Sequence, residues 1–379
     1  MRRTRTITTI LVLLSCITLS CEVTQTLSRR QRLARIDRVV KEEIQDGNIP
    51  GAVVLVGRAD RILYWEAFGS QMTEPQREAM TKDAIFDLAS LTKPIATATS
   101  IMILRERGEL DLDDFVAEYL PAFGCQGKEG VRIKHLLAHT SGLPAYTSAG
   151  ELEQEFGTPC PDKLIEKVCS LEPLSPPGEK FRYSCLGYIT LAKIVEVVAG
   201  EAIDDFAGDN IFAPLRMKHT MYNPPESWQE NIAATEIVDG QVLRGTVHDP
   251  LARLAAGVSG NAGLFSTAYD LSIYCRMLLS GGVCKNTRVL SSEAVELLTT
   301  AQSHGRAYGF DVSSGYSWVK GSLAPKEAFC HTGFTGTSIV CDPASRTYVI
   351  ILTNVVHPYG KGTSRPIRTK VADVVFSSL

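Results

Sequence analysis

The chain has 379 residues, of which 44% are apolar and 21% are charged, and its formal charge at neutral pH is −3. This composition supports a large buried core and gives no basic excess, so nucleic acid is not an expected partner. The sequence contains no His-Glu-x-x-His, no paired Cys-x-x-Cys and no glycine-rich phosphate loop. We therefore expect neither a metal ion nor another cofactor.

The first 21 residues are typical of a secretory signal peptide. Three arginines among the first five residues form a positive segment, and the apolar run from 7 to about 19 is too short for a membrane span. The run ends in Leu19-Ser20-Cys21, where a small residue before a cysteine resembles the cleavage site of a bacterial lipoprotein. We expect an exported protein, periplasmic or in the cell envelope, with a lipid on Cys21. Plain secretion with cleavage nearby is the alternative.

The remaining sequence predicts a helix, a strand pair, a mostly helical middle, more strands and a closing helix. The predicted helices are 28–45, one that begins near Ser90, 133–139, 186–199, 270–279 and 365–375; the predicted strands are 52–57, 62–65, 308–320, 328–331, 337–341 and 348–352. This order implies an α+β fold with an antiparallel sheet flanked by the N- and C-terminal helices and an inserted all-helical lobe. We expect one two-lobed unit over residues 26–379, with the active site between the lobes.

Eight cysteines follow Cys21, and an exported protein could pair some of them. Cys330 and Cys341 flank an expected hairpin turn at Thr335-Gly336, so a disulfide between them is one hypothesis. Strand register decides whether they face each other, and register cannot be read from sequence.

Ser90 and Lys93 form a Ser-x-x-Lys pair at the start of an apolar helix. Residues three apart share a helix face, so the hydroxyl and the amine come within hydrogen-bond reach. A serine becomes a nucleophile when a base takes its proton, and a desolvated lysine can be that base. Pro94 fits only a first helical turn, which puts Ser90 at the positive end of the helix dipole. We expect Ser90 to be catalytic; a structural N-cap serine is the alternative.

A second Ser-x-x-Lys pair, Ser317 and Lys320, lies in the predicted strand 308–320. Positions three apart on a strand face opposite sides of the sheet. We therefore discard this pair as a catalytic candidate.

Tyr183-Ser184-Cys185 lies just before a predicted helix. A tyrosine beside two polarisable side chains could move a proton near Ser90. The alternative is a tyrosine that packs its ring and leaves its hydroxyl at the surface.

His331-Thr332-Gly333-Phe334 lies at the predicted hairpin. A strand edge of this kind can offer a backbone N–H to an oxyanion and a hydroxyl to a carboxylate, and Gly333 would let substrate approach the backbone. The alternative is an ordinary glycine-rich turn. Two further stretches have structural interpretations: His139-Thr140-Ser141-Gly142 ends a helix, and Val247-His248-Asp249 forms an Asx turn in a loop that could border the cleft.

Taken in order, these motifs resemble the serine penicillin-recognising superfamily, which includes class C β-lactamases, D-Ala-D-Ala peptidases and related esterases. Matching stretches run from Ile49-Pro50-Gly51 to Asn354 and include His139-Thr140-Ser141-Gly142-Leu143-Pro144 and Gly263-Leu264-Phe265-Ser266-Thr267. The segment from His331 to Thr337 and the segment Thr353–Pro358 look most like β-lactamase-related penicillin-binding lipoproteins.

The resemblance implies a role for each matching residue. Ser90 would be the acylated nucleophile and Lys93 its base, and Tyr183 would move a proton to the leaving group. The backbone N–H groups of Ser90 and Phe334 would form the oxyanion hole. His331-Thr332 would meet the carboxylate of the substrate.

Two positions depart from the pattern of that superfamily. The class C motif Tyr-x-Asn reads Tyr183-Ser184-Cys185, so a thiol, which is a weak donor and acceptor, replaces an amide. Lys-Thr-Gly reads His331-Thr332-Gly333, and a histidine is mostly uncharged at neutral pH. We expect Cys185 to be a small packed residue; a reactive thiol is the alternative.

The sequence thus predicts a serine hydrolase that forms an acyl-enzyme on an amide or ester. The expected activity is that of a D-Ala-D-Ala carboxypeptidase or penicillin-binding protein acting on peptidoglycan stem peptides, with β-lactams as further ligands. The alternatives are an esterase and a catalytically weak binding or sensor lipoprotein. The expected partners are a small-molecule or peptide substrate and, through the lipid anchor, the membrane.

Overall fold

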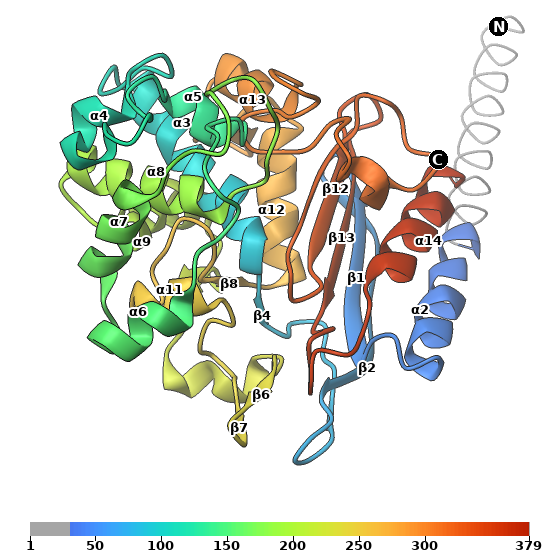
Figure 1. Cartoon of the computed structure of the whole chain (residues 1–379). Coiled ribbons are helices and arrows are strands. Elements are labelled where there is room, and N and C mark those ends of the chain that lie inside the picture. Colours follow the sequence, from blue (N-terminus) through green and yellow to red (C-terminus); the bar gives the residue numbers. More distant parts are fainter. Residues whose placement is uncertain (1–30, 379) are drawn as a thin grey trace, which may run out of the picture.

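The computed structural model describes residues 31–378 and is built around a six-stranded antiparallel sheet (Figure 1). The strand order places the last three strands of the sequence beside the first three. In that order the strands are β11 (Phe329–Thr332), β12 (Ser338–Asp342), β13 (Thr347–Thr353), β1 (Gly51–Arg58), β2 (Arg61–Met72) and β3 (Glu78–Ala79). The expected α+β class, with a sheet assembled from both ends of the chain, is confirmed.

Strand β1 is apolar along its length because both faces of the sheet are covered. Val53 and Leu55 belong to the core that the sheet shares with the helical part of the protein. Val54 and Val56 belong to a second core on the opposite face. Successive side chains of a strand point to opposite faces, so one run of valine and leucine serves both cores.

Helices α2 (Arg35–Gln45) and α14 (Arg365–Phe376) cover the second face of the sheet and contact each other (Figure 1). Each turns one apolar stripe inward: Ile36, Val39 and Val40 from α2 are buried, as are Ile367, Val371 and Val375 from α14. This spacing of three and four is that of an amphipathic helix. The flanking terminal helices are therefore confirmed.

The other side of the sheet carries the helical part of the protein (Figure 1). Its helices are α3 (Thr99–Glu106), α4 (Val116–Tyr119), α5 (Ile133–Leu137), α6 (Ala149–Phe156), α7 (Pro161–Ser170), α8 (Cys185–Ala199), α9 (Ile203–Ala207), α10 (Ala213–Leu215), α11 (Pro250–Leu254), α12 (Ala268–Leu278) and α13 (Ser292–Thr299). Short strands lie among them: β4 (Phe86–Asp87), β5 (Met221–Tyr222), β6 (Ile237–Val238), β7 (Gln241–Val242), β8 (Leu264–Ser266), β9 (Val283–Cys284) and β10 (Thr287–Arg288). Within residues 31–378, none of the helices has both the length and the apolar character needed to cross a bilayer.

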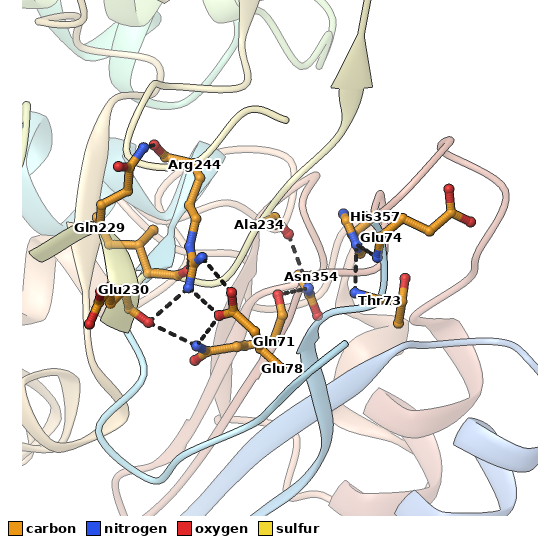
Figure 2. Close-up of polar contacts among 11 residues, drawn as sticks. Gln71, Thr73, Glu74, Glu78, Gln229, Glu230, Ala234, Arg244, Asn354 and His357 are labelled. Atoms are coloured by element: carbon orange, nitrogen blue, oxygen red, sulfur yellow. Dashed lines mark hydrogen bonds and ion pairs between the residues drawn. The ribbon is translucent and has the colours of Figure 1, made fainter. Parts of the chain in front are cut away.

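A set of polar contacts ties the sheet edge to the loop between the helices (Figure 2). Arg244 forms an ion pair of 2.6 Å with Glu78, at the end of the hairpin that follows β2. The Asn354 amide donates to the backbone oxygens of Gln71 and Ala234 at 2.9 and 3.0 Å. These bonds hold the loop that leads to His248 against the sheet.

The predicted strand 308–320 is wrong. The segment consists of turns and ends in a 3-10 helix, Ser317–Lys320; its only β-pairings among the described residues are isolated bridges at Asp311. The buried Lys320 amine donates to the backbone oxygens of Val312 and Ala328 at 2.6 and 2.8 Å. These side-chain hydrogen bonds take the place of the backbone bonds of a strand. Tertiary contacts therefore decide the conformation of this segment, in spite of the strand preference of its aromatic and β-branched residues.

The hypothesis of a Cys330–Cys341 disulfide is also wrong. Cys341 is paired with Phe329, and Cys330 with Val340. A shift of one residue points the two thiols to opposite faces of the sheet, Cys330 into one core and Cys341 into the other. Both thiols are free.

Candidate active site

The turn that carries Ser90 is held in a strained conformation. Ala89 has a positive φ of 46°, which is unusual for a residue with a side chain. The Asp87 carboxylate accepts the Ala89 N–H at 2.8 Å and keeps the turn in place. The predicted helix does begin here, but as a 3-10 turn (Ala89–Leu91) and a wider π turn (Lys93–Ala98) before α3. Strain of this kind is common where a reactive side chain is presented.

Ser90 and Lys93 are brought together as the sequence predicted. The Lys93 Nζ lies 3.0 Å from the Ser90 Oγ and also donates to the backbone oxygen of Asn261 at 2.8 Å. Lys93 is fully buried, whereas Ser90 is only partly covered. The amine is thus fixed on the protein side while the hydroxyl faces the cleft.

Cys185 completes the surroundings of the amine. Its Sγ lies 3.5 Å from the Lys93 Nζ. Burial lowers the pKa of Lys93, but negative charge on the Cys185 sulfur and the Tyr183 oxygen would raise it, and the net direction is upward. While both partners keep their protons, burial and the charge of Asp249 act on the pKa of Lys93 in opposite directions. Burial is the larger influence, and it favours the neutral amine that a base requires.

Tyr183 lies beside the same amine. The Lys93 Nζ is 5.2 Å from the centre of the Tyr183 ring. The ring packs against His139 at 4.3 Å and against Tyr316 at 5.3 Å between centroids. His139 does follow the end of α5, as predicted, yet its contact with Tyr183 was not anticipated from sequence.

The hairpin between β11 and β12 is fastened directly to the Ser90 turn. The Thr335 hydroxyl donates to the Asp87 backbone oxygen at 2.7 Å, and the Thr337 hydroxyl donates to the Leu88 backbone oxygen at 3.0 Å. A Cβ on Gly333 would lie 2.3 Å from the Leu88 oxygen and 2.1 Å from the Thr337 Oγ1. The close approach of these two backbones therefore requires glycine at 333.

The backbone N–H groups of Ser90 and Phe334 are available to a ligand. Among residues 31–378, neither N–H donates a hydrogen bond to another group. Two free N–H groups on adjoining segments are what an oxyanion hole needs.

His331 is buried and uncharged. Its Nδ1 lies 3.0 Å from the Thr332 backbone oxygen, which fits a neutral ring that donates from Nδ1. Burial, and then the positive charges of Arg306 and Lys93, lower the pKa of His331 well below its ordinary value. This histidine does not replace the charge of a lysine.

Two buried arginines that the sequence analysis missed supply positive charge at the same place. Arg306 forms an ion pair of 3.0 Å with Asp311. Arg368, from α14, donates to the backbone oxygens of Gly333 and Thr337, each at 2.8 Å, and burial lowers its pKa to about 10. Neither arginine lies in a recognisable motif, so sequence carried no signal for them.

These groups share one cavity of about 350 Å³, whose lining is Ser90, Tyr183, Arg306, Asp311, Tyr316, Cys330, His331, Thr332, Gly333, Phe334 and Arg368. The lining joins segments from four distant parts of the sequence. Among residues 31–378, no group of three His, Cys, Asp or Glu side chains is placed to hold a metal ion.

The loop at 247–249 does not line this cavity but contacts Phe334, which does. The Asp249 side chain accepts from the Ala252 N–H, three residues on, at 2.9 Å; it is thus the N-cap of α11 rather than the expected Asx turn, which would bond two residues on. The His248 N–H donates to Asp87 at 2.7 Å, and its ring stacks on the exposed Phe334 at 5.6 Å. The loop thus contacts both the Ser90 turn and the hairpin.

The second Ser-x-x-Lys pair has no such surroundings. Ser317 and Lys320 lie on a 3-10 helix rather than on a strand, so the reason for discarding the pair was wrong. The Ser317 hydroxyl donates to the Ser314 backbone oxygen at 2.8 Å, and the Lys320 amine is fully engaged by carbonyls. Neither side chain activates the other.

A sequence model of the Beta-lactamase family matches residues 36–373 of the chain. The chain belongs to the Beta-lactamase family. An "N-acetylmuramyl-L-alanine amidase" of Bacillus subtilis (strain 168) is 32% identical in an alignment 361 positions long that covers 86% of this chain and 82% of that protein. A protein of Escherichia coli (strain K12) named "Putative D-alanyl-D-alanine carboxypeptidase" is 30% identical in an alignment 369 positions long that covers 86% of this chain and 83% of that protein.

Solved structures of the same fold include EstCE1, a hydrolase with promiscuous acyltransferase activity, with a TM-score of 0.74, 24% identity and coverage of 92% and 99% of the two chains. A class C β-lactamase from Rhodobacter sphaeroides gives a TM-score of 0.71 at 21% identity, with coverage of 91% and 99%. At this identity the likeness concerns the fold. The named relatives in this family are hydrolases, and they include peptidases, amidases and β-lactamases.

The two departures from the motifs of the Beta-lactamase family take up defined positions in the structure. Cys185, in place of asparagine, contacts the Lys93 amine through sulfur. His331, in place of lysine, is neutral and has Arg306 and Arg368 on the walls of the same cavity. The positive charge of this family member is therefore carried by different residues.

Proposed function

We propose that this protein is a serine hydrolase that forms an acyl-enzyme on Ser90. The 3.0 Å contact between the Ser90 Oγ and the Lys93 Nζ is the observation that carries this proposal. The Asn261 carbonyl holds the amine at 2.8 Å, so the amine has little freedom to turn away from the serine. A positioned base of this kind contributes about 10²–10⁴-fold to the rate of nucleophilic attack.

The chemistry follows from the contacts of these groups. The Ser90 oxygen attacks the substrate carbonyl while Lys93 takes its proton. The Ser90 and Phe334 N–H groups receive the negative charge that develops on the carbonyl oxygen. The proton passes by way of Tyr183 to the leaving amine or alcohol as the carbonyl bond breaks, and water later hydrolyses the acyl group from Ser90.

We propose peptidoglycan stem peptides that end in D-Ala-D-Ala as the substrate class. The names of the Bacillus subtilis and Escherichia coli relatives support a cell-wall substrate. A free C-terminal carboxylate is an anion, and the hydroxyl of Thr332 and the buried Arg368 lie on the walls of the cavity beside Ser90. Charge-assisted hydrogen bonds to a carboxylate are stronger than neutral ones.

Mass spectrometry of the intact protein tests the proposal. Incubation with a penicillin, an activated ester or an acyl-D-Ala-D-Ala peptide should add one acyl group to Ser90. The adduct should be absent in Ser90→Ala and present in Ser317→Ala, which removes the serine of the second pair. The proposal fails if the wild-type protein gives no adduct with any of the three reagents, or if the adduct persists in Ser90→Ala.

One observation favours a second candidate, a penicillin-recognising protein with weak turnover. Cys185 presents sulfur to Lys93 where the family motif has an amide, and sulfur makes only weak hydrogen bonds. A single acyl group that forms slowly and is not released would support this binding or sensor role. Rapid turnover of an ester without turnover of the peptide would instead support an esterase.

We also propose export and a lipid on Cys21, a position that lies outside the described residues. The charged and apolar segments of the sequence support this, and so does the cell-wall substrate named for the relatives. Mass spectrometry of the protein from membranes should find a diacylglycerol on Cys21, and Cys21→Ser should release the protein into the soluble fraction. An unmodified cysteine would contradict the proposal.

A further inference from the structure

A buried ion pair stands behind the active-site tyrosine and has no part in the steps described above. Arg306 and Asp311 expose only 1% and 2% of their side chains, and their charged atoms are 3.0 Å apart. The same Asp311 carboxylate accepts the hydroxyl and the N–H of Ser314, so it is held on two sides. A buried ion pair needs such support because both charges have lost their water.

The guanidinium group is aimed at aromatic rings of the cleft. Its carbon lies 6.0 Å from the centre of the Tyr183 ring and 5.8 Å from that of Phe181. The Lys93 amine faces the same Tyr183 ring at 5.2 Å. Cations attract the face of an aromatic ring, so Arg306 acts on this tyrosine at all times and Lys93 acts on it once it has taken up a proton.

The ion pair with Asp311 uses only part of the hydrogen-bonding capacity of the Arg306 guanidinium group. Its Nε and Nη2 are buried and, among residues 31–378, have no hydrogen-bond partner. The Nε2 atoms of His139 and His331 are likewise buried without a partner, and both rings pack against Tyr183. Buried polar atoms that protein groups leave unpaired are rare and often mark functional sites.

We propose that Arg306, fixed by Asp311, is a positioning residue of this active site that acts through Tyr183 and the two histidines packed on it. The inference rests on the proposed function, because it assigns to Arg306 and Asp311 a supporting role behind the residues that contact the Ser90 site. The charge of Arg306 holds the Tyr183 ring in place and keeps His139 and His331 neutral. Protonation of either histidine would put another positive charge next to Lys93 and would oppose its action as a proton acceptor.

The other titratable groups around Arg306 are consistent with this role for its charge. The titratable and charged groups that face it are Lys93, His139, Tyr183, Tyr188, Asp311, Tyr316, Cys330, His331 and Arg368. Burial and, next, the charge of Arg306 lower the pKa of both His139 and His331 well below the ordinary value. Asp311 is the one acid in this set, and Arg306 neutralises it.

Histidine-ring NMR on the full chain is the first test, and its readout does not depend on catalysis. In the wild-type protein, the His139 and His331 rings should gain protons only well below the pH near 6.5 at which exposed histidines titrate. In Arg306→Met, both rings should gain protons at a pH at least about one unit higher. Wild-type titration of either ring near pH 6.5 would overturn the inference, even if Arg306→Met did not fold.

The pH profile of Ser90 acylation by an activated ester is the second test. We expect Arg306→Met to lower the acylation rate constant about tenfold or more at pH 6 and less at pH 8, with little change in KM. Arg306→Lys, which keeps the charge, should retain the wild-type shape of the profile. Arg105→Met, which removes an exposed ion pair with Glu293, is the matched control and should change neither. A parallel loss at all pH values would mean a merely structural role and would refute the proposal, whereas absence of any acylation in the wild type would refute the proposed function instead.

Discussion

The sulfur of Cys185 lies 3.5 Å from the amine of Lys93, at the place where the family motif has an asparagine amide. An amide can donate to a substrate carbonyl and accept from an amine at once, whereas a thiol does both weakly. This contact and the neutral His331 are the two places where the site departs from the family motifs, and Cys185 is the one that touches the base.

Cys185→Asn should therefore raise the rate of acylation. A hydrogen bond that is restored to a buried partner is worth about 1–3 kcal/mol, so we expect an increase of roughly tenfold or more. Stopped-flow measurement of acylation by a chromogenic penicillin or ester gives the rate constant. Cys185→Ala is the control and should not accelerate the reaction; an equal gain in both variants would mean that the thiol obstructs the site by size alone.

Lys93→Met should abolish acylation while the helix is kept. The methionine fills a similar volume but cannot accept the Ser90 proton, so we expect a loss of about 10²–10⁴-fold at all pH values from 6 to 9. Rapid-quench mass spectrometry gives the acylated fraction over time. Lys320→Met is the matched control from the second pair: it should lower stability by about 1–3 kcal/mol, since carbonyls lose a donor, and leave the acylation rate of folded protein unchanged.

Gly333→Ala should disable the site by separating two backbones. The added Cβ would lie 2.3 Å from the Leu88 oxygen and 2.1 Å from the Thr337 Oγ1, so the hairpin and the Ser90 turn must move apart. We expect a loss of acylation of at least about 100-fold and a destabilisation of about 1–3 kcal/mol, typical of overpacking. Gly315→Ala, where no atom lies within 4 Å of the added Cβ, should keep both near wild type. Thermal unfolding and acylation assays on the two variants decide the matter.

Acid should destabilise the protein through its buried neutral histidines. Burial lowers the pKa of His139, His331 and His357 in the folded state. The unfolded chain therefore binds more protons, so this stability is fully present above the unfolded pKa of about 6.5 and is lost as the pH falls below it. We expect the free energy of unfolding, measured with urea at several pH values, to fall steadily from pH 7 to pH 5.

His357 offers a single-residue check of that dependence. Its Nε2 accepts the Thr73 N–H at 2.9 Å (Figure 2). Its Nδ1 donates to the Thr235 backbone oxygen at 2.8 Å, and only the neutral ring can make both bonds. His357→Gln should lower stability at pH 7 and make the fall toward pH 5 shallower. An unchanged slope would exclude His357 as a contributor.

Much of the fold was readable from local patterns. The helical spacing in α2, α8, α12 and α14, and the valine-rich β1, are periodic signals that tertiary contacts reinforce. The strand predicted for 308–320 was wrong because the aromatic content of this segment is typical of a strand. In the structure, hydrogen bonds from the Lys320 amine to backbone carbonyls hold the segment as turns. Strand register could not be predicted either, because it depends on contacts between strands. Cys341 pairs with Phe329, one position away from Cys330, and this shift places the two thiols on opposite faces of the sheet.

The sequence by itself determined the family, the helix–sheet order and the shared face of Ser90 and Lys93, because residues three apart in one helical turn lie on one side of it. Only the tertiary structure decided that His139, Arg306 and Arg368 belong to the same site, since they come from the segment after α5, a loop and α14, which are far apart in the sequence. It also decided that His331 is neutral, because its charge depends on burial and on the two cations nearby rather than on its own chemistry.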